Sequence, residues 1–290
     1  LLVMLFLVLA LLALSLLQER RAAQLPAGVA ICLLLAVAVM VVGALAYWFR
    51  RLGPLIILGL LVGLFFLNRS DFFVGRFYAY GLRYTGAPAH YTPARLAALA
   101  SDSAVAQDRA AALRALEAWR ARAQAATGQA RPALLLICST GGGLRSATWS
   151  LTALQAADSA LGGRLLTHTR LMAGASGGMM GAAYYRELHF ARLQGQAPTA
   201  LPHPNCPEAA RRISQDLLNP VATRLAAGAF SPLGTFTEGG QDYYKERGYF
   251  FEKQFIENTG AFAHRRLGHY AGAEAAGLLP QLVLTPAIIN

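Results

Sequence analysis

Cysteine and lysine are scarce in this chain of 290 residues, and each scarcity argues against a class of protein. The three cysteines are odd in number, and their spacing fits neither a disulfide framework nor a zinc site, so we expect no metal centre. Lys245 and Lys253 are the only lysines among 26 basic residues, and no block of five Lys or Arg occurs. The net charge of +11 therefore does not predict a nucleic-acid-binding surface, and an anionic membrane surface is its better partner.

Nucleotide-binding glycine motifs are also missing from the sequence. It contains neither G-x-x-x-x-G-K-[ST] nor a G-x-G-x-x-G with an acidic partner about 20 residues later. We therefore expect no nucleotide and no other cofactor.

Apolar residues are abundant: they make up 55% of the chain, and they are concentrated in its first 67 residues. Three runs, at 1–17, 26–48 and 52–67, have no polar face. A helix of about 20 apolar residues crosses a hydrocarbon core of about 30 Å, so we predict three transmembrane helices. A signal peptide competes for the first run, but it would need a basic segment ahead of the run, and none is present.

The arginines around these runs predict the orientation of the chain in the membrane. Five lie on one side of the predicted helices and two on the other: Arg20, Arg21, Arg69, Arg76 and Arg83 against Arg50 and Arg51. The positive-inside rule then predicts an integral membrane protein whose C-terminal domain is cytoplasmic.

The residues after the third run connect it to a second domain. The aromatic-rich segment 71–84 is either an interfacial segment at headgroup level or a plain connector, and it closes a membrane region at 1–83. A helical connector is expected over 84–130, with a helix start at Thr92-Pro93. Its long helix, 103–126, carries an apolar stripe that we expect to dock on a core: Val105, Ala112, Leu116 and Trp119.

From residue 131 the pattern predicts an α/β domain that runs to residue 290. Short apolar runs that precede glycine turns predict buried parallel strands, and longer periodic stretches predict helices. We expect strands at 133–138, 167–173 and 281–288 and helices at 144–161, 177–193, 208–218 and 241–257, with a loop over 228–240. Asn219-Pro220 should end or kink the helix before it.

The sequence Gly174-Ala175-Ser176-Gly177-Gly178 has the G-x-S-x-G form of a nucleophile elbow, between a predicted strand and a predicted helix. Such a turn strains the backbone at the serine and needs small neighbours, which Gly174, Gly177 and Gly178 supply. Gly181 and Ala182 repeat the small residues one turn later, so we expect this helix to pack tightly on the sheet. We interpret Ser176 as a candidate nucleophile.

A run of three glycines, Gly141-Gly142-Gly143, ends the neighbouring predicted strand. Two of their backbone N–H groups could point at the carbonyl oxygen of an ester bound at Ser176, and each such donor is worth about 3–4 kcal/mol in the transition state. Arg145, in the first turn of the next helix, could brace this loop or attract a phosphate. A nucleophile and an oxyanion loop within about 35 residues predict an acyl-transfer site.

The pair Gly-Gly-Gly-x-Arg and Gly-x-Ser-Gly-Gly resembles the patatin-like phospholipase family over residues 131–290. The resemblance implies a three-layer α/β fold with a mainly parallel sheet, truncated here at its C-terminus. It also implies a membrane-anchored serine hydrolase of lipid acyl esters that uses a Ser–Asp dyad, with Ser176 as nucleophile and Gly141 to Gly143 as oxyanion loop. Thr140 stands where the family usually has an acidic residue.

The aspartate of the implied dyad is not found in this chain. It should open an Asp-Gly-Gly or Asp-Gly-Ala motif after a later strand, and the sequence contains neither motif. Asp216 and Asp242 lack the right context, and Glu238-Gly239-Gly240 comes before the strand that should precede it. We therefore expect the chain to be a fragment, inactive by itself, with the aspartate beyond Asn290.

Two other functions remain open from the sequence. An α/β-hydrolase would use a Ser–His–Asp triad. The histidines available for it carry no motif: His168, His189, His203, His264 and His269. A non-catalytic, membrane-anchored lipid-binding protein could have the same fold.

Overall fold

The chain is described by a computed structural model, which covers residues 2–17, 20, 24–69, 92–195, 201–228 and 234–285. It divides into two compact units, each described by itself. The helical unit comprises Leu1–Ala87 and Leu217–Gln254, and the sheet unit comprises Pro88–Asp216 and Phe255–Asn290. The predicted interfacial segment 71–84 lies outside the described residues.

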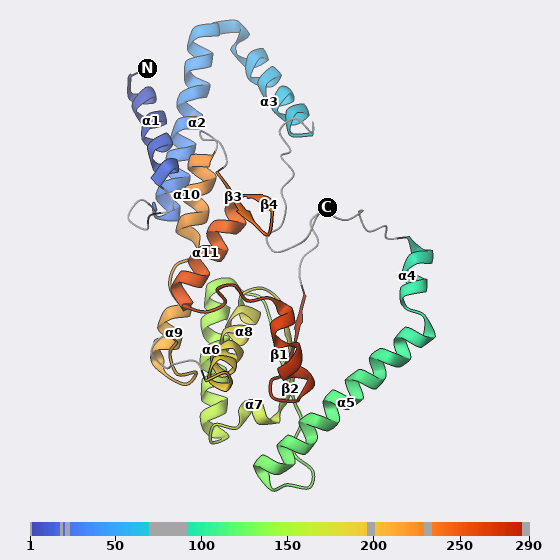
Figure 1. Cartoon of the computed structure of the whole chain (residues 1–290). Coiled ribbons are helices and arrows are strands. Elements are labelled where there is room, and N and C mark those ends of the chain that lie inside the picture. Colours follow the sequence, from blue (N-terminus) through green and yellow to red (C-terminus); the bar gives the residue numbers. More distant parts are fainter. Residues whose placement is uncertain are drawn as a thin grey trace. The chain divides into compact units, whose positions relative to one another are not determined.

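The helical unit begins with three apolar helices at the predicted positions (Figure 1). They are α1 (Leu2–Leu17), α2 (Ala27–Phe49) and α3 (Gly53–Arg69), and a short 3-10 turn, η2 (Arg50–Leu52), joins the last two. By length and composition, one stretch of the described chain can cross a membrane: Ala27–Gly63, with a mean hydropathy of 3.0. The three transmembrane helices and their orientation stay predictions.

Helix α10 (Leu218–Gly228) packs on the start of α2 through small residues, among them Ala30, Ala222 and Ala226. The prediction that Asn219-Pro220 ends or kinks a helix is wrong, because these residues lie in the first turn of α10. A proline is tolerated there, since its missing N–H has no partner in a first turn. The expected helix 208–218 is instead α9 (Pro207–Ile213) followed by the start of α10.

The side chains of α10 also cap the N-terminus of α2. Asn219 Oδ1 accepts a hydrogen bond from the N–H of Ala27 at 2.9 Å, and Thr223 Oγ1 accepts one from the N–H of Leu25 at 3.0 Å. The bond to Ala27 satisfies a donor that the helix start leaves without a partner, and the bond to Leu25 fixes the chain just before it, so α10 holds the N-terminal end of α2 in place.

A β-hairpin occupies the expected loop and the start of the expected helix 241–257. Strand β3 (Thr235–Glu238) pairs with β4 (Gln241–Tyr244), and α11 (Arg247–Thr259) begins only after them. Gly239 and Gly240 form the turn with φ of 60° and 79°, values that suit a two-residue type I′ turn. The prediction of a helix from residue 241 is therefore wrong over 241–246. The Gly-Gly pair forms a hairpin turn, and the residues after it continue as strand β4.

The sheet unit contains a parallel sheet of three strands, which confirms the predicted α/β class with a parallel sheet. The strands β1 (Leu135–Ser139), β2 (Thr169–Gly174) and β5 (Gln281–Leu284) lie in the order β1-β2-β5. Helix α6 (Gly143–Ala160) follows β1, and α8 (Ser176–Leu193) follows β2, as predicted. The short helix α7 (Leu165–His168), directly before β2, was not predicted.

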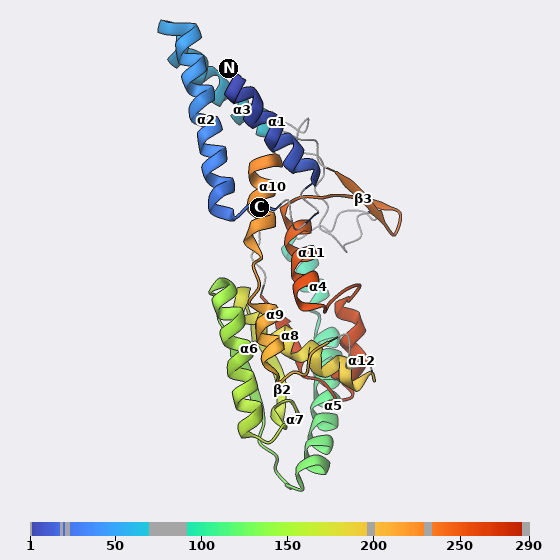
Figure 2. The same ribbon diagram turned by 90° about the vertical axis from the view of Figure 1, so that its left-hand side faces the viewer.

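Helix α8 lies beside α6 (Figures 1 and 2), and glycines make this approach possible. A Cβ on Gly181 would lie 2.1 Å from the carbonyl oxygen of Ala147 in α6. The small residues of α8 were expected to allow tight packing on the sheet, but their closest approach is to α6 and to the loop before it. The helix pair shares a buried core that includes Leu151, Ala182 and Leu188.

Helix α5 (Asp102–Thr127), preceded by α4 (Pro93–Leu99), confirms the predicted long helix but docks only by its C-terminal half. Trp119 is buried, and its indole N–H donates to the carbonyl oxygen of Thr167 at 3.0 Å. Val105, near the start of the helix, is 54% exposed. The predicted apolar stripe is therefore longer than the part of α5 that packs on the rest of the sheet unit.

Buried charges connect α8 to the segment before β5, which contains η3 (Leu267–Tyr270) and α12 (Ala271–Ala275). Glu187 is 1% exposed, and its carboxylate accepts hydrogen bonds from Arg265 Nε at 2.8 Å and Tyr270 Oη at 2.6 Å. Arg186 donates to the carbonyl oxygen of Pro280 at 2.7 Å and pairs with Glu274. Both of these buried charges are thus paired, which offsets the cost of removing them from water.

We expect Gly181→Ala to destabilise the protein, because the added Cβ would overlap the carbonyl oxygen of Ala147 and force α6 and α8 apart. Overpacking of this kind costs about 1–3 kcal/mol of folding free energy. The matched control is Gly272→Ala, because no atom lies within 4 Å of the added Cβ and alanine favours the helix. Thermal unfolding in detergent should show a lower midpoint for the first variant only; equal midpoints would contradict the close packing.

Candidate active site

Ser176 occupies the sharp turn between β2 and α8, as the G-x-S-x-G motif predicts. Ala175 is extended, with φ −137° and ψ 157°, and Ser176 follows with φ 54°, in the left-handed region. A left-handed conformation costs a residue with a Cβ about 1–2 kcal/mol. The side chain of Ser176 is exposed at the carboxyl edge of the sheet.

The three glycines form a loop directly beside this serine. A Cβ on Gly141 would lie 3.3 Å from Ser176 Cβ and 3.7 Å from Ser176 Oγ. Gly142 and Gly143 have φ of 141° and 61°, backbone conformations that favour glycine. Their N–H groups and that of Gly141 donate no hydrogen bond to any residue that the structure describes. The loop therefore offers backbone donors next to the serine hydroxyl.

Close approaches hold the elbow against this loop. A Cβ on Gly174 would lie 2.5 Å from the carbonyl oxygen of Ser139, and one on Gly177 would lie 1.9 Å from that of Gly143. Gly178 meets the carbonyl oxygen of Thr140 in the same way, at 2.1 Å. All three glycines are needed because no side chain fits in these positions. The elbow thus has the small neighbours that its form requires, and the supporting role of these glycines in a reaction stays a prediction.

Ser146 fastens the glycine loop and was missed in the sequence. Its hydroxyl donates to the carbonyl oxygen of Thr140 at 3.0 Å, across the loop from the first turn of α6. A Cβ added at Gly142 would lie 2.9 Å from the Cβ of Ser146. The only sequence signal for this role is a small hydroxyl residue four positions after Gly142. We regard Ser146 as a positioning residue.

Arg145 does not brace the glycine loop through any interaction that the described residues show. It lines a shallow hollow of about 410 Å³ on α6, together with Trp149, Thr152 and Ser214. Trp149 is 74% exposed, although tryptophan is usually largely buried. A cation and an exposed indole thus lie on the helix that starts at the glycine loop.

No carboxylate or imidazole within the described part of the sheet unit is hydrogen bonded to Ser176 Oγ. Asp216 accepts a hydrogen bond at its backbone oxygen from Asn258 Nδ2, at 3.0 Å. His168 Nδ1 lies 3.2 Å from the carbonyl oxygen of Ala133. In the helical unit, Asp242 accepts from Thr237 Oγ1 at 2.5 Å. The structure brings the serine and the glycines together, and within the described residues of the sheet unit it shows no general base hydrogen bonded to the serine.

The third strand ends at the same edge of the sheet as the elbow. Gly174 pairs with Leu284 at the end of β5, and the N–H of Thr285 donates to the carbonyl oxygen of Gly174 at 3.1 Å. In parallel sheets of α/β proteins, catalytic and ligand-binding groups gather at this carboxyl edge.

Comparisons of the chain with protein-family models, with curated proteins and with solved structures found no match. The patatin-like resemblance thus rests on the two glycine motifs.

Proposed function

We propose that this chain carries the nucleophile of a membrane-anchored serine hydrolase that acts on lipid acyl esters and resembles the patatin-like phospholipases. One observation carries the proposal: Ser176 has a left-handed backbone at a strand–helix elbow, and the Gly141–Gly143 loop lies directly against it. A serine in a plain turn needs neither the strain nor a neighbouring row of free backbone donors.

The proposed reaction is a two-step acyl transfer. Ser176 Oγ attacks the ester carbonyl and gives up its proton to a base, and the glycine N–H groups stabilise the oxyanion that forms. The N-terminus of α8 adds a positive dipole end at the same place. The base then returns the proton to the leaving alcohol, and water hydrolyses the acyl-enzyme.

A carboxylate base fits this scheme because an ionised carboxylate can take the proton of Ser176 directly. The resemblance assigns this role to an aspartate, which we propose lies beyond Asn290. The ending of β5 beside Gly174 supports this assignment, since the chain that continues from Thr285 starts at the carboxyl edge of the sheet.

Lipid esters are the proposed substrates because the same chain carries an apolar anchor. The stretch Ala27–Gly63 is long and apolar enough to cross a membrane, and a net charge of +11 favours an anionic membrane surface. We propose three membrane-spanning helices and a cytoplasmic sheet unit. A membrane-impermeant maleimide should then label a cysteine placed at Arg51 in intact cells but not one placed at Pro202; the reverse pattern would contradict the orientation.

Hydrolysis of a chromogenic acyl ester by the full-length protein tests the function. We expect Ser176→Ala to abolish turnover, since the variant keeps the elbow and loses only the nucleophile. Gly142→Ala should reduce turnover about 10²-fold or more, because the added Cβ meets Ser146 and displaces the N–H donors.

Gly272→Ala is the control for the glycine variant, because its added Cβ meets no atom within 4 Å. Full turnover by Gly142→Ala would remove the loop from the mechanism. A well-folded wild-type protein that hydrolyses no acyl ester would favour a non-catalytic lipid-binding protein.

A further inference from the structure

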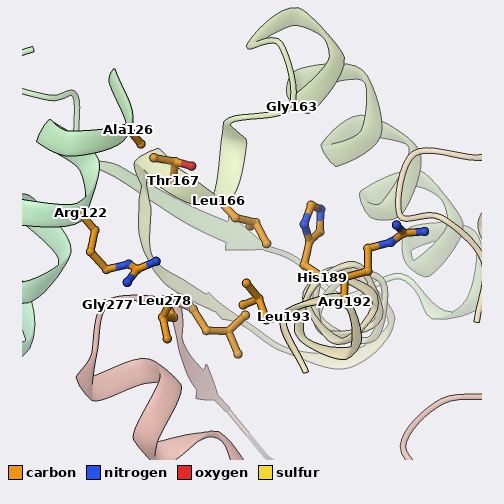
Figure 3. Close-up of a pocket in the computed structure, with 11 residues that line it drawn as sticks. Arg122, Ala126, Gly163, Leu166, Thr167, His189, Arg192, Leu193, Gly277 and Leu278 are labelled. Atoms are coloured by element: carbon orange, nitrogen blue, oxygen red, sulfur yellow. The ribbon is translucent and has the colours of Figure 1, made fainter. Parts of the chain in front are cut away.

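A cavity of about 330 Å³ lies in the sheet unit, and Figure 3 shows the residues that line it. Its walls come from α5, from the turn and short helix before β2, from the end of α8 and from the segment before β5. Six of the residues that line it carry the argument: Arg122, Leu166, His189, Arg192, Leu193 and Leu278. The volume lies at the lower end of the range for sites that bind small molecules.

This cavity is separate from the proposed catalytic site. Ser176 begins α8, whereas His189 and Arg192 lie in its last turns. His189 lies thirteen positions after Ser176 along the helix, which corresponds to about 20 Å. The other walls precede β2 and β5, so the cavity lies at the amino edge of the sheet and the elbow at its carboxyl edge.

The charged groups on the wall of the cavity are cationic. Arg122 comes from α5 and points toward the apolar side chains in Figure 3, whereas the guanidinium group of Arg192, from α8, points away from them. Neither guanidinium group forms an ion pair or hydrogen bond with another residue in the described ranges. The unpaired guanidinium group of Arg122 attracts an anion, and it can bind a carboxylate or phosphate in a bidentate manner.

His189 contributes a neutral polar group. Burial lowers the pKa of its imidazole to about 4, so the ring is uncharged at neutral pH. The imidazole packs edge-on against Tyr185, and the centres of the two rings lie 4.7 Å apart. Its Nε2 is buried and has no hydrogen-bond partner in the described part of the chain. The positive charge that faces the cavity at neutral pH therefore comes from Arg122.

The rest of the wall is apolar. Leu166, Leu193 and Leu278 come from three different segments, and their side chains lie around one space in Figure 3. Leu193 is 54% exposed, which leaves apolar surface in contact with water. A bare inorganic anion would leave these leucines uncovered, whereas a ligand with a hydrocarbon part would bury them and gain about 25 cal/mol per Å².

We propose that this cavity binds a small amphiphile with one anionic head group, which pairs with Arg122, and a short apolar body, which packs on the leucines. The ligand chemistry follows from the combination of an unpaired guanidinium group and exposed leucines around one volume. The site goes beyond the proposed hydrolysis, because it needs neither Ser176 nor the glycine loop.

Calorimetric titration of the full-length protein in lipid nanodiscs tests the proposal. The probes are hexanoate and hexyl phosphate, with hexanol as the neutral match and acetate as the head group alone. We expect saturable binding of at least one of the two amphiphilic anions, and much weaker binding of hexanol and acetate. The better of the two anions identifies the head group.

The variants separate this site from surface charge in general. Arg122→Gln should weaken binding about tenfold, because it removes a charge-assisted hydrogen bond. Arg120→Gln, on the same helix and exposed, is the matched control and should bind as the wild type does. Unchanged thermal midpoints would show that the variants are folded.

Several outcomes would overturn the proposal. The absence of saturable binding would overturn it, and so would equally strong binding of hexanol. An affinity that falls as much in Arg120→Gln as in Arg122→Gln would also contradict it. Loss of binding in Ser176→Ala would place the ligand at the elbow instead. Retained binding in an inactive Ser176→Ala variant would keep this site independent of the hydrolase proposal.

Discussion

The arrangement of the sheet unit depends on backbone-to-backbone contact at the start of α8. Gly177, Gly178 and Gly181 face the carbonyl oxygens of Gly143, Thr140 and Ala147 at distances that exclude any Cβ. This contact brings the first two turns of α8 against both α6 and the loop that precedes it. The elbow and the glycine loop are therefore adjacent because two helices approach each other more closely than side chains allow. Ser176 keeps its left-handed backbone within that packing.

The elements around the site could be predicted from the sequence because their signals are local. A run of glycines after a short apolar run, and G-x-S-x-G after another, each restrict the backbone within a few residues. Parallel pairing of β1 with β2 then places both turns at the same edge of the sheet. The family, the base and the substrate do not follow from these local signals, since they depend on residues far apart in sequence.

Other features could not be predicted because longer-range contacts decide them. Asn219-Pro220 starts α10, because the Asn219 side chain has a partner in the N–H of Ala27, which is far away in sequence. Three of the four residues in the apolar stripe on α5 remain exposed, because only the turns around Trp119 meet a neighbour. The cavity at the amino edge combines four segments, so no single stretch of sequence contains its pattern. The Gly239-Gly240 turn differs from these features, because its hairpin signal is local and can be found in the sequence.

The central claim is that Ser176 is an activated nucleophile held beside an oxyanion loop. Fluorophosphonates react covalently with such serines, so labelling of the full-length protein followed by peptide mass spectrometry tests the claim directly. The account predicts one modified residue, Ser176, and loss of labelling in Ser176→Ala with an unchanged thermal midpoint. Modification of a different serine, or equal labelling of the Ser176→Ala variant, would contradict it.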